Sequence, residues 1–113
     1  MEHDERNDTI RRKLLDEIAD IEAFTAQRAV DELASDRMYQ KAIVMSLINI
    51  GELSKSFTAE YLSAMPQIPW KSIRGFTNIA AHQYEIIDFM DVQKTIREDI
   101  PALKAALEAV AES

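Results

Sequence analysis

The chain contains no cysteine, and its 113 residues include only two glycines and three prolines. Without cysteine it can form neither a disulfide nor a thiolate metal site, which agrees with a cytoplasmic location. So few breakers favour long helices over many short strands joined by turns. The longest nearly unbroken apolar run, residues 42–50, is too short to cross a bilayer. The charged N-terminal segment lacks the apolar centre of a secretory signal.

Acidic residues outnumber basic ones, and the formal net charge is −7. Such a molecule repels nucleic acid unless a local basic cleft overcomes the global field, and Lys55, Lys71 and Arg74 are the candidates for that cleft. A basic protein partner is the alternative. The length fits a single domain, residues 1–113, with residues 1–7 expected to be flexible. His3 lies in that segment and is assigned no role.

Apolar residues recur at helical spacing along most of the chain. The pattern predicts helices over residues 8–26, 37–57, 58–65, 70–82 and from Asp88 or Asp91 to about 110. Asp8 or Thr9 is expected to cap the first of these helices, and Thr58 the third. A short helical turn anchored by Val30 and Leu33 is expected between the first two.

Two prolines bear on the predicted helix boundaries. Pro69 fits the first position of the helix over 70–82, where its missing N–H is not needed. Pro101 falls inside the last apolar stripe, so a kink or break is expected near residues 99–101. The segment 37–57 is apolar on more than one side. It is either the central helix of a monomeric bundle or, as we favour, a helix covered by a second copy of the chain.

The segment 68–84 holds the only tryptophan, one of the two histidines, and Arg74, Asn78 and His82 on one side of a single predicted helix. In an ideal helix Asn78 is offset from Arg74 by about 40° and His82 by about 80°, with a rise of about 12 Å from Arg74 to His82. Imidazole exchanges protons near neutral pH, and guanidinium matches phosphate oxygens. These are the parts needed to cleave RNA through its own 2′-hydroxyl. The alternative is that His82 merely packs or caps at a helix end.

Four sequence motifs together resemble the HepT-like branch of the HEPN superfamily, also called the domain of unknown function 86. They are Asn-Ile-Gly-Glu at 49–52, Ile-Pro-Trp at 68–70, Ile-Arg-Gly-Phe-Thr-Asn-Ile-Ala-Ala-His-Gln-Tyr at 73–84 and Asp-Ile-Pro-Ala-Leu at 99–103. The resemblance covers roughly residues 37–110. It implies an all-α, up-and-down bundle of four or five helices that forms a homodimer. It also implies a cytoplasmic toxin, a metal-independent ribonuclease without cofactor, whose antitoxin is a nucleotidyltransferase.

Within the family motif, the histidine corresponds to His82, the asparagine to Asn78 and a tyrosine that the partner can adenylylate to Tyr84. The chain departs from the motif at Thr77, where the family usually carries arginine. Threonine cannot supply a permanent charge to a phosphate. Arg74 is the nearest substitute; alternatively, a dimer could bring Arg74 or Lys71 of one copy toward His82 of the other.

Two further residues have competing interpretations. Glu52 could orient His82, pair with Arg74, or form a purely structural ion pair. Trp70 is expected to anchor the core rather than to stack on a base. Two functions are therefore open: a ribonuclease that uses His82, Arg74 and Asn78, with Lys71 contacting phosphate, or a catalytically degenerate module that binds a nucleotidyltransferase and is modified on Tyr84. A generic interaction bundle without any nucleotide connection is the third and weakest alternative.

Overall fold

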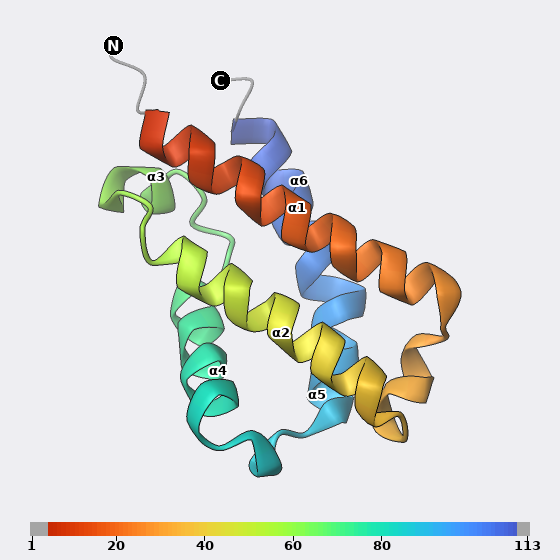
Figure 1. Cartoon of the computed structure of the whole chain (residues 1–113). Helices are drawn as coiled ribbons and strands as arrows, with labels where there is room; N and C mark the ends of the chain where they lie inside the picture. Colours follow the sequence, from red (N-terminus) through yellow and green to blue (C-terminus); the bar gives the residue numbers. More distant parts are fainter. Residues whose placement is uncertain (1–4, 111–113) are drawn as a thin grey trace.

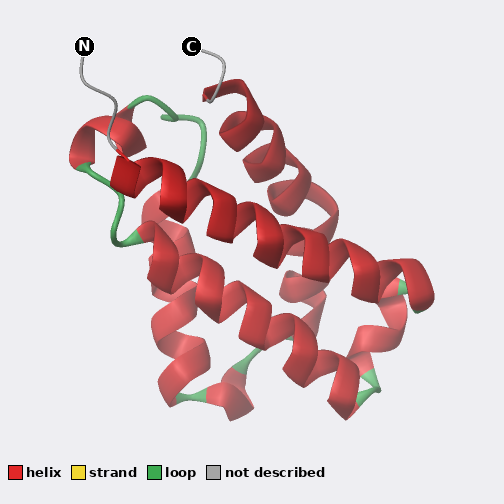
Figure 2. Ribbon diagram, turned by 45° about the horizontal axis from the view of Figure 1, so that its top comes forward, coloured by secondary structure: helices red, strands yellow, loops and turns green. Residues whose placement is uncertain are grey.

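A computed structural model describes residues 5–110 of the chain; His3 lies outside them. All regular structure in this range is helical (Figure 2). The elements in chain order are α1 (Glu5–Gln27), η1 (Val30–Ala34), α2 (Arg37–Ser54), α3 (Ala59–Ser63), α4 (Trp70–His82), η2 (Tyr84–Ile86), α5 (Phe89–Lys94), η3 (Thr95–Asp99) and α6 (Ile100–Val110). The prediction of an all-α fold is confirmed.

Figure 1 shows α1 and α2 running antiparallel, α4 beside α2, and α5, η3 and α6 joined in one column that returns along α1. The up-and-down arrangement leaves α2 between α1 and α4, which explains why so much of its surface is apolar. Along residues 5–110 no helix combines the length and the hydrophobicity needed to span a membrane.

The core is an aliphatic cluster to which α1, α2 and the α5–α6 column contribute at helical spacing. The first helix contributes one side chain to the core at each successive turn, and α2 and the α5–α6 column supply most of the remaining side chains. Its most buried members include Leu14, Ile18, Ile21, Ile43, Ile50, Val92, Leu103 and Leu107. Burying each such side chain contributes about 1.5–3 kcal/mol, so this cluster is the main source of stability.

The first helix begins earlier than predicted, and neither Asp8 nor Thr9 caps it. Residues 5–7, which were expected to be flexible, form its first turn. Buried Asn7 donates to Thr58 Oγ1 at 3.1 Å and accepts from the Thr58 N–H at 3.2 Å. The Arg6 guanidinium donates to the Ser56 carbonyl at 2.9 Å. These contacts with a distant turn extend α1, and local sequence could not reveal them.

Most other boundaries agree with the prediction. Thr58 caps α3 by accepting from the Tyr61 N–H, and Asp88 caps α5 by accepting from the Met90 N–H. The second helix ends at Ser54 rather than residue 57. Pro69 precedes α4 instead of beginning it, because its carbonyl already accepts the first helical hydrogen bond, from the Ile73 N–H at 3.0 Å.

Pro101 perturbs the last helix without breaking it. The chain remains helical from α5 into α6, but residues 95–99 form a π-helical turn. Proline has no N–H to donate to the carbonyl one turn earlier. The helix accommodates the missing hydrogen bond in a wider π turn at residues 95–99. The predicted distortion is therefore real, although it lies about one turn earlier and is not a break.

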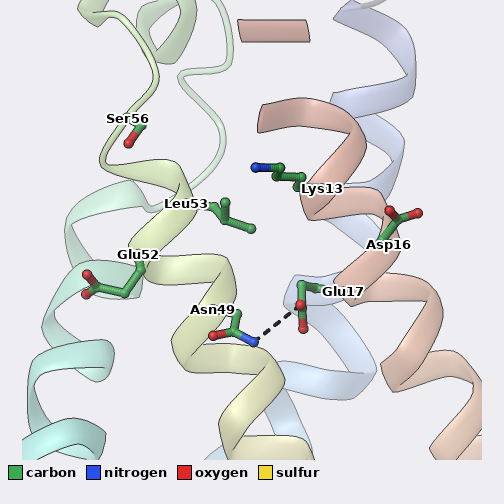
Figure 3. Close-up of a pocket in the computed structure, with 7 residues that line it drawn as sticks. All are labelled: Lys13, Asp16, Glu17, Asn49, Glu52, Leu53 and Ser56. Atoms are coloured by element: carbon green, nitrogen blue, oxygen red, sulfur yellow. Dashed lines mark hydrogen bonds between the residues drawn. The ribbon is translucent and has the colours of Figure 1, made fainter. Parts of the chain in front are cut away.

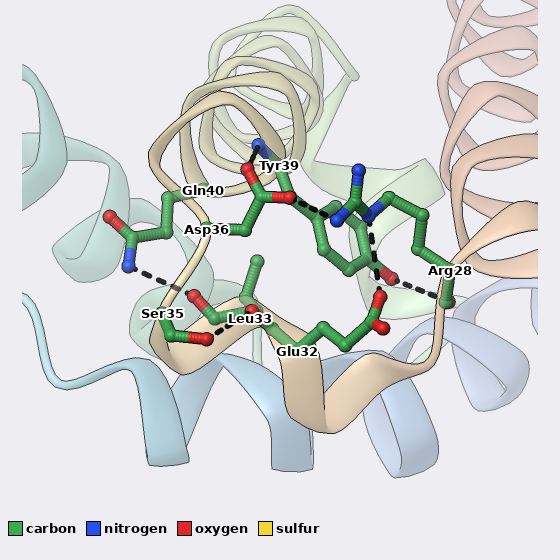
Figure 4. A network of polar contacts seen from close by, with 7 residues as sticks. All are labelled: Arg28, Glu32, Leu33, Ser35, Asp36, Tyr39 and Gln40. Carbon is green, nitrogen blue, oxygen red and sulfur yellow. Dashed lines mark hydrogen bonds and ion pairs between the residues drawn. The ribbon is translucent and has the colours of Figure 1, made fainter.

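Figure 4 shows the polar corner that joins α1 to α2 through η1. Arg28 pairs with Glu32 and with Asp36, while the Tyr39 hydroxyl donates to the Arg28 carbonyl at 3.2 Å. Burial of the phenol, reinforced by nearby Glu32, raises the pKa of Tyr39 above its ordinary value of 10.0. Buried Leu33 anchors η1 as expected. The corner thus fixes the start of α2.

Candidate functional site

The α4 helix carries most of the predicted site, and Trp70 fixes its first turn. The Trp70 ring is buried and meets the Phe57 ring edge-on, with 6.0 Å between centroids. Phe57 in turn stacks on Tyr61 at 4.5 Å. Trp70 therefore anchors the core, as predicted, and is not a platform for a nucleic-acid base.

Lys71, Asn78 and His82 are exposed on α4, and Arg74 is half-buried. Helical geometry places all four on one side, away from the buried residues Trp70, Thr77 and Ala80. Among residues 5–110, no hydrogen bond or ion pair engages any of these four side chains. Two cations, an amide and an imidazole are thus free to contact a ligand, although no side-chain contact within the described range holds them in a fixed geometry.

Thr77 does not belong to this exposed set. It is 1% exposed, and its hydroxyl donates to the Ile73 carbonyl at 3.0 Å rather than to a site residue. It lies against Gly51 of α2 so closely that a Cβ on Gly51 would be 1.7 Å from Thr77 Oγ1. Thr77 is therefore a helix-packing residue. The position at which the family motif has arginine lies here between two helices.

Glu52 is exposed and pairs with Lys55, with 2.8 Å between the carboxylate and Nζ. The interpretation as an ion pair is the one that the structure supports; the hydrogen bonds and ion pairs of residues 5–110 do not link Glu52 to His82 or Arg74. Such an exposed pair contributes only a few tenths of a kcal/mol. Lys55, a candidate for the basic cleft, has its charge compensated by this carboxylate.

A groove with a volume of about 410 Å³ lies between α1 and α2 and is acidic. Figure 3 shows Glu17 from α1 facing Asn49 from α2, whose amide donates to Glu17 at 3.3 Å, while Lys13 extends from α1 toward Leu53. Its other lining residues are Asp16, Glu52, Leu53 and Ser56. Carboxylates outnumber the single lysine, so this groove disfavours RNA. The Asn49–Glu17 contact and the role of Gly51 were not predicted from the sequence; the quoted motif at 49–52 was the available signal.

Tyr84 follows α4 in η2, two residues after His82. Its ring meets Phe89 edge-on, with 6.2 Å between centroids, and its hydroxyl oxygen is buried without a hydrogen-bond partner. A buried, unpartnered hydroxyl is costly, by about 1–3 kcal/mol. Any chemistry at this oxygen requires η2 to move and expose it.

Comparison with known proteins gives a consistent result. The family model Ribonuclease HepT-like matches residues 14–110. The "Putative RNase MJ1380" of Methanocaldococcus jannaschii is 31% identical over 97 residues, covering 86% of this chain and 89% of that protein. The "Probable ribonuclease HepT" of Thermococcus cleftensis is 33% identical over 88 residues, covering 78% and 80%. No solved structure gives a significant match.

Proposed function

Since the chain belongs to the HepT-like ribonuclease family, we propose that it is a metal-independent endoribonuclease in which His82 transfers the proton. The observation that carries the proposal is the unengaged His82 imidazole, on the same exposed side of α4 as Arg74 and Lys71. The family motif assigns its histidine to this position. As the toxin of a toxin–antitoxin pair, the protein acts in the cytoplasm.

In the proposed reaction the imidazole takes the proton of the ribose 2′-hydroxyl, and the resulting oxygen attacks the adjacent phosphorus. The bond from phosphorus to the 5′-oxygen breaks, which leaves a 2′,3′-cyclic phosphate. The 5′-oxygen leaves with a proton from the imidazolium or from water. Arg74 stabilises the charge that develops on the phosphate oxygens, Asn78 orients the substrate and Lys71 contacts a neighbouring phosphate.

A homodimer is the second part of the proposal. Met38 and Met45 lie seven residues apart on one side of α2 and are 84% and 56% exposed. Apolar side chains in such positions favour burial against a second copy. A dimer also offers a route around the helical rise of about 12 Å that separates Arg74 from His82, because the cation and the imidazole at one phosphate can then come from different copies.

The decisive test of the ribonuclease is His82→Ala. We expect cleavage of a labelled RNA to fall to background, and growth arrest on expression to disappear, because no other described residue on this face exchanges protons near neutral pH. Gln67→Ala, an exposed change in the loop before α4, serves as the control purified in parallel. Circular dichroism confirms folding. Cleavage by pure His82→Ala protein at the wild-type rate would refute the mechanism.

The burial of Thr77 favours a second candidate, a catalytically degenerate module that binds a nucleotidyltransferase and is adenylylated on Tyr84. In this case the wild-type chain does not cleave RNA, and mass spectrometry detects the addition of one AMP after incubation with the partner and ATP. Tyr84→Phe should abolish the addition. Introducing arginine at Thr77 cannot decide between the candidates by activity alone, because the side chain would have to displace the contact with Gly51.

A further inference from the structure

The segment that follows α4 presents apolar side chains among carboxylates. Ile86 is 59% and Met90 65% exposed, and Glu85, Asp88 and Asp91 are exposed beside them. These five residues form what we call the acidic apolar patch. There is no lysine or arginine from residue 83 to residue 93. Within the described range, none of the three carboxylates has an ion-pair partner.

The patch is ordered by the local backbone. The Ile87 N–H donates to the Tyr84 carbonyl at 3.1 Å, which closes η2, and the Asp91 N–H donates to the Asp88 carbonyl at 3.0 Å. Asp88 also caps α5 through the Met90 N–H at 2.9 Å. Side chains held on such turns are presented at a lower entropic cost than side chains on a flexible loop. The exposure of Ile86 and Met90 is therefore built into the fold.

The exposed methionines of α2 have neighbours of the opposite charge. Met38 and Met45 of α2 lie near Arg37 and Lys41, both exposed and basic. The two surfaces therefore suit different occupants. The α2 surface is the one that we assign to the homodimer, which leaves the acidic apolar patch uncovered.

We propose that the acidic apolar patch docks a basic amphipathic segment of a different protein. Its lysines or arginines would pair with Glu85, Asp88 and Asp91, while its apolar side chains cover Ile86 and Met90. Three carboxylates that form no ion pair within residues 5–110 repel RNA and anionic lipid. They attract a cationic protein and speed its association. Neither charge nor exposed apolar area alone distinguishes this surface; their combination does.

The patch begins three residues after His82 in the sequence and directly after Tyr84, so we expect an occupant to restrict access to His82. The docked partner would therefore inhibit RNA cleavage. This regulatory consequence rests on the proposed ribonuclease function, whereas the docking itself does not. The two can be tested separately.

Binding is tested with a fluorescent synthetic peptide that forms a helix with leucines on one face and lysines on the other. We expect the full chain to bind it, and Ile86→Ser/Met90→Ser and Glu85→Lys/Asp91→Lys each to weaken binding at least about tenfold, the equivalent of about 1.4 kcal/mol. Asp16→Lys/Asp20→Lys on α1 is the control, because it changes the net charge equally at a distant exposed site. Circular dichroism verifies that every variant folds.

Equal weakening by the α1 control, or no weakening by the patch variants, overturns the docking site. So does equally tight binding of a peptide with glutamate in place of lysine. Dissociation of the chain's own dimer by Ile86→Ser/Met90→Ser, seen by light scattering, identifies a second copy as the occupant and also overturns the proposal. In a parallel assay the lysine peptide should inhibit RNA cleavage by wild type. A wild-type chain that binds the peptide but never cleaves RNA refutes the ribonuclease, not the docking site.

Discussion

Arg74 and Thr77 stand three positions apart on α4 in opposite surroundings. Arg74 is half-buried with its guanidinium unpaired among the described residues, whereas Thr77 is enclosed against Gly51. A permanent positive charge for phosphate can therefore come from Arg74 but not from the side chain at position 77. In the proposed ribonuclease, Arg74 is therefore the α4 residue that we expect to stabilise charge on the phosphate.

Arg74→Ala should lower kcat for RNA cleavage about 100-fold, because removing one group that stabilises transition-state charge commonly has an effect of this size. Arg74→Lys should recover only part of the loss, since lysine keeps the charge but not the planar fork. Arg97→Ala, an exposed arginine on η3, is the matched control and should leave kcat unchanged. Wild-type kcat in Arg74→Ala would show that the cation comes from elsewhere.

Tyr39 makes the stability of the fold sensitive to alkaline pH. Its pKa is raised in the folded state, first by burial and then by Glu32, so the folded chain holds the phenolic proton more tightly than the unfolded chain. The contribution of Tyr39 to stability is therefore fully present below its unfolded-state pKa of about 10 and is lost as the pH rises through the folded-state pKa. Urea unfolding at pH 8 and above pH 10 should show this loss of stability, and the loss should be smaller in Tyr39→Phe. An identical loss in the variant would assign the pH dependence to other groups, such as Tyr61, whose pKa is also raised by burial.

Helical periodicity indicated both the exposed side of α4 and most of its buried side. The spacing of Arg74, Asn78 and His82 follows from helical periodicity alone, and the exposed side that it predicts is present. Periodicity left open whether Phe76 or Thr77 is the buried residue, because that depends on which residue of α4 meets Gly51 of α2, a tertiary contact. A structural ion pair was one of the three interpretations of Glu52, but its partner was not predicted, although Lys55 lies only three residues away in the sequence.

The contact between α2 and α4 depends on the absence of a side chain at Gly51. Gly51→Ala should lower the free energy of unfolding by about 1–3 kcal/mol, because a new Cβ meets Thr77 in a tightly packed interface. Gly75→Ala is the matched control: a Cβ there meets nothing within 4 Å, so alanine should raise stability by up to about 1 kcal/mol through helix propensity. Thermal melts compare the two. Equal stabilities would contradict the close approach.

Helix boundaries were predicted well where local capping determines them and poorly where distant contacts do. Thr58 and Asp88 cap as expected from residue type. The predicted start of α1 was too late, because Asn7 and Arg6 are held by the turn before α3, about fifty residues away in sequence. A distortion near Pro101 was predicted from the sequence. Its form, a π turn at residues 95–99, depends on how α5 and α6 together pack on the core.

The bundle as a whole carries an excess of negative charge, so its assembly should rely on apolar contact rather than on attraction between copies. Met38→Ser/Met45→Ser should convert the proposed dimer into monomers, because both side chains are largely exposed on α2. Light scattering coupled to size exclusion measures the mass. Lys94→Ser, an exposed change on α5, is the control; a variant that remains dimeric would place the interface elsewhere.

The π turn at residues 95–99 also sets the rotational phase of the C-terminal helix. Relative to an uninterrupted α-helix, a π turn accommodates one additional residue. Deleting one residue there would restore an ordinary α-helix and leave the downstream residues facing as they do now, whereas a deletion from a regular α-helix rotates everything downstream by about 100°. Leu103 and Leu107 would therefore stay enclosed. Residues 95–99 are thus the part of this helical column expected to tolerate the loss of one residue.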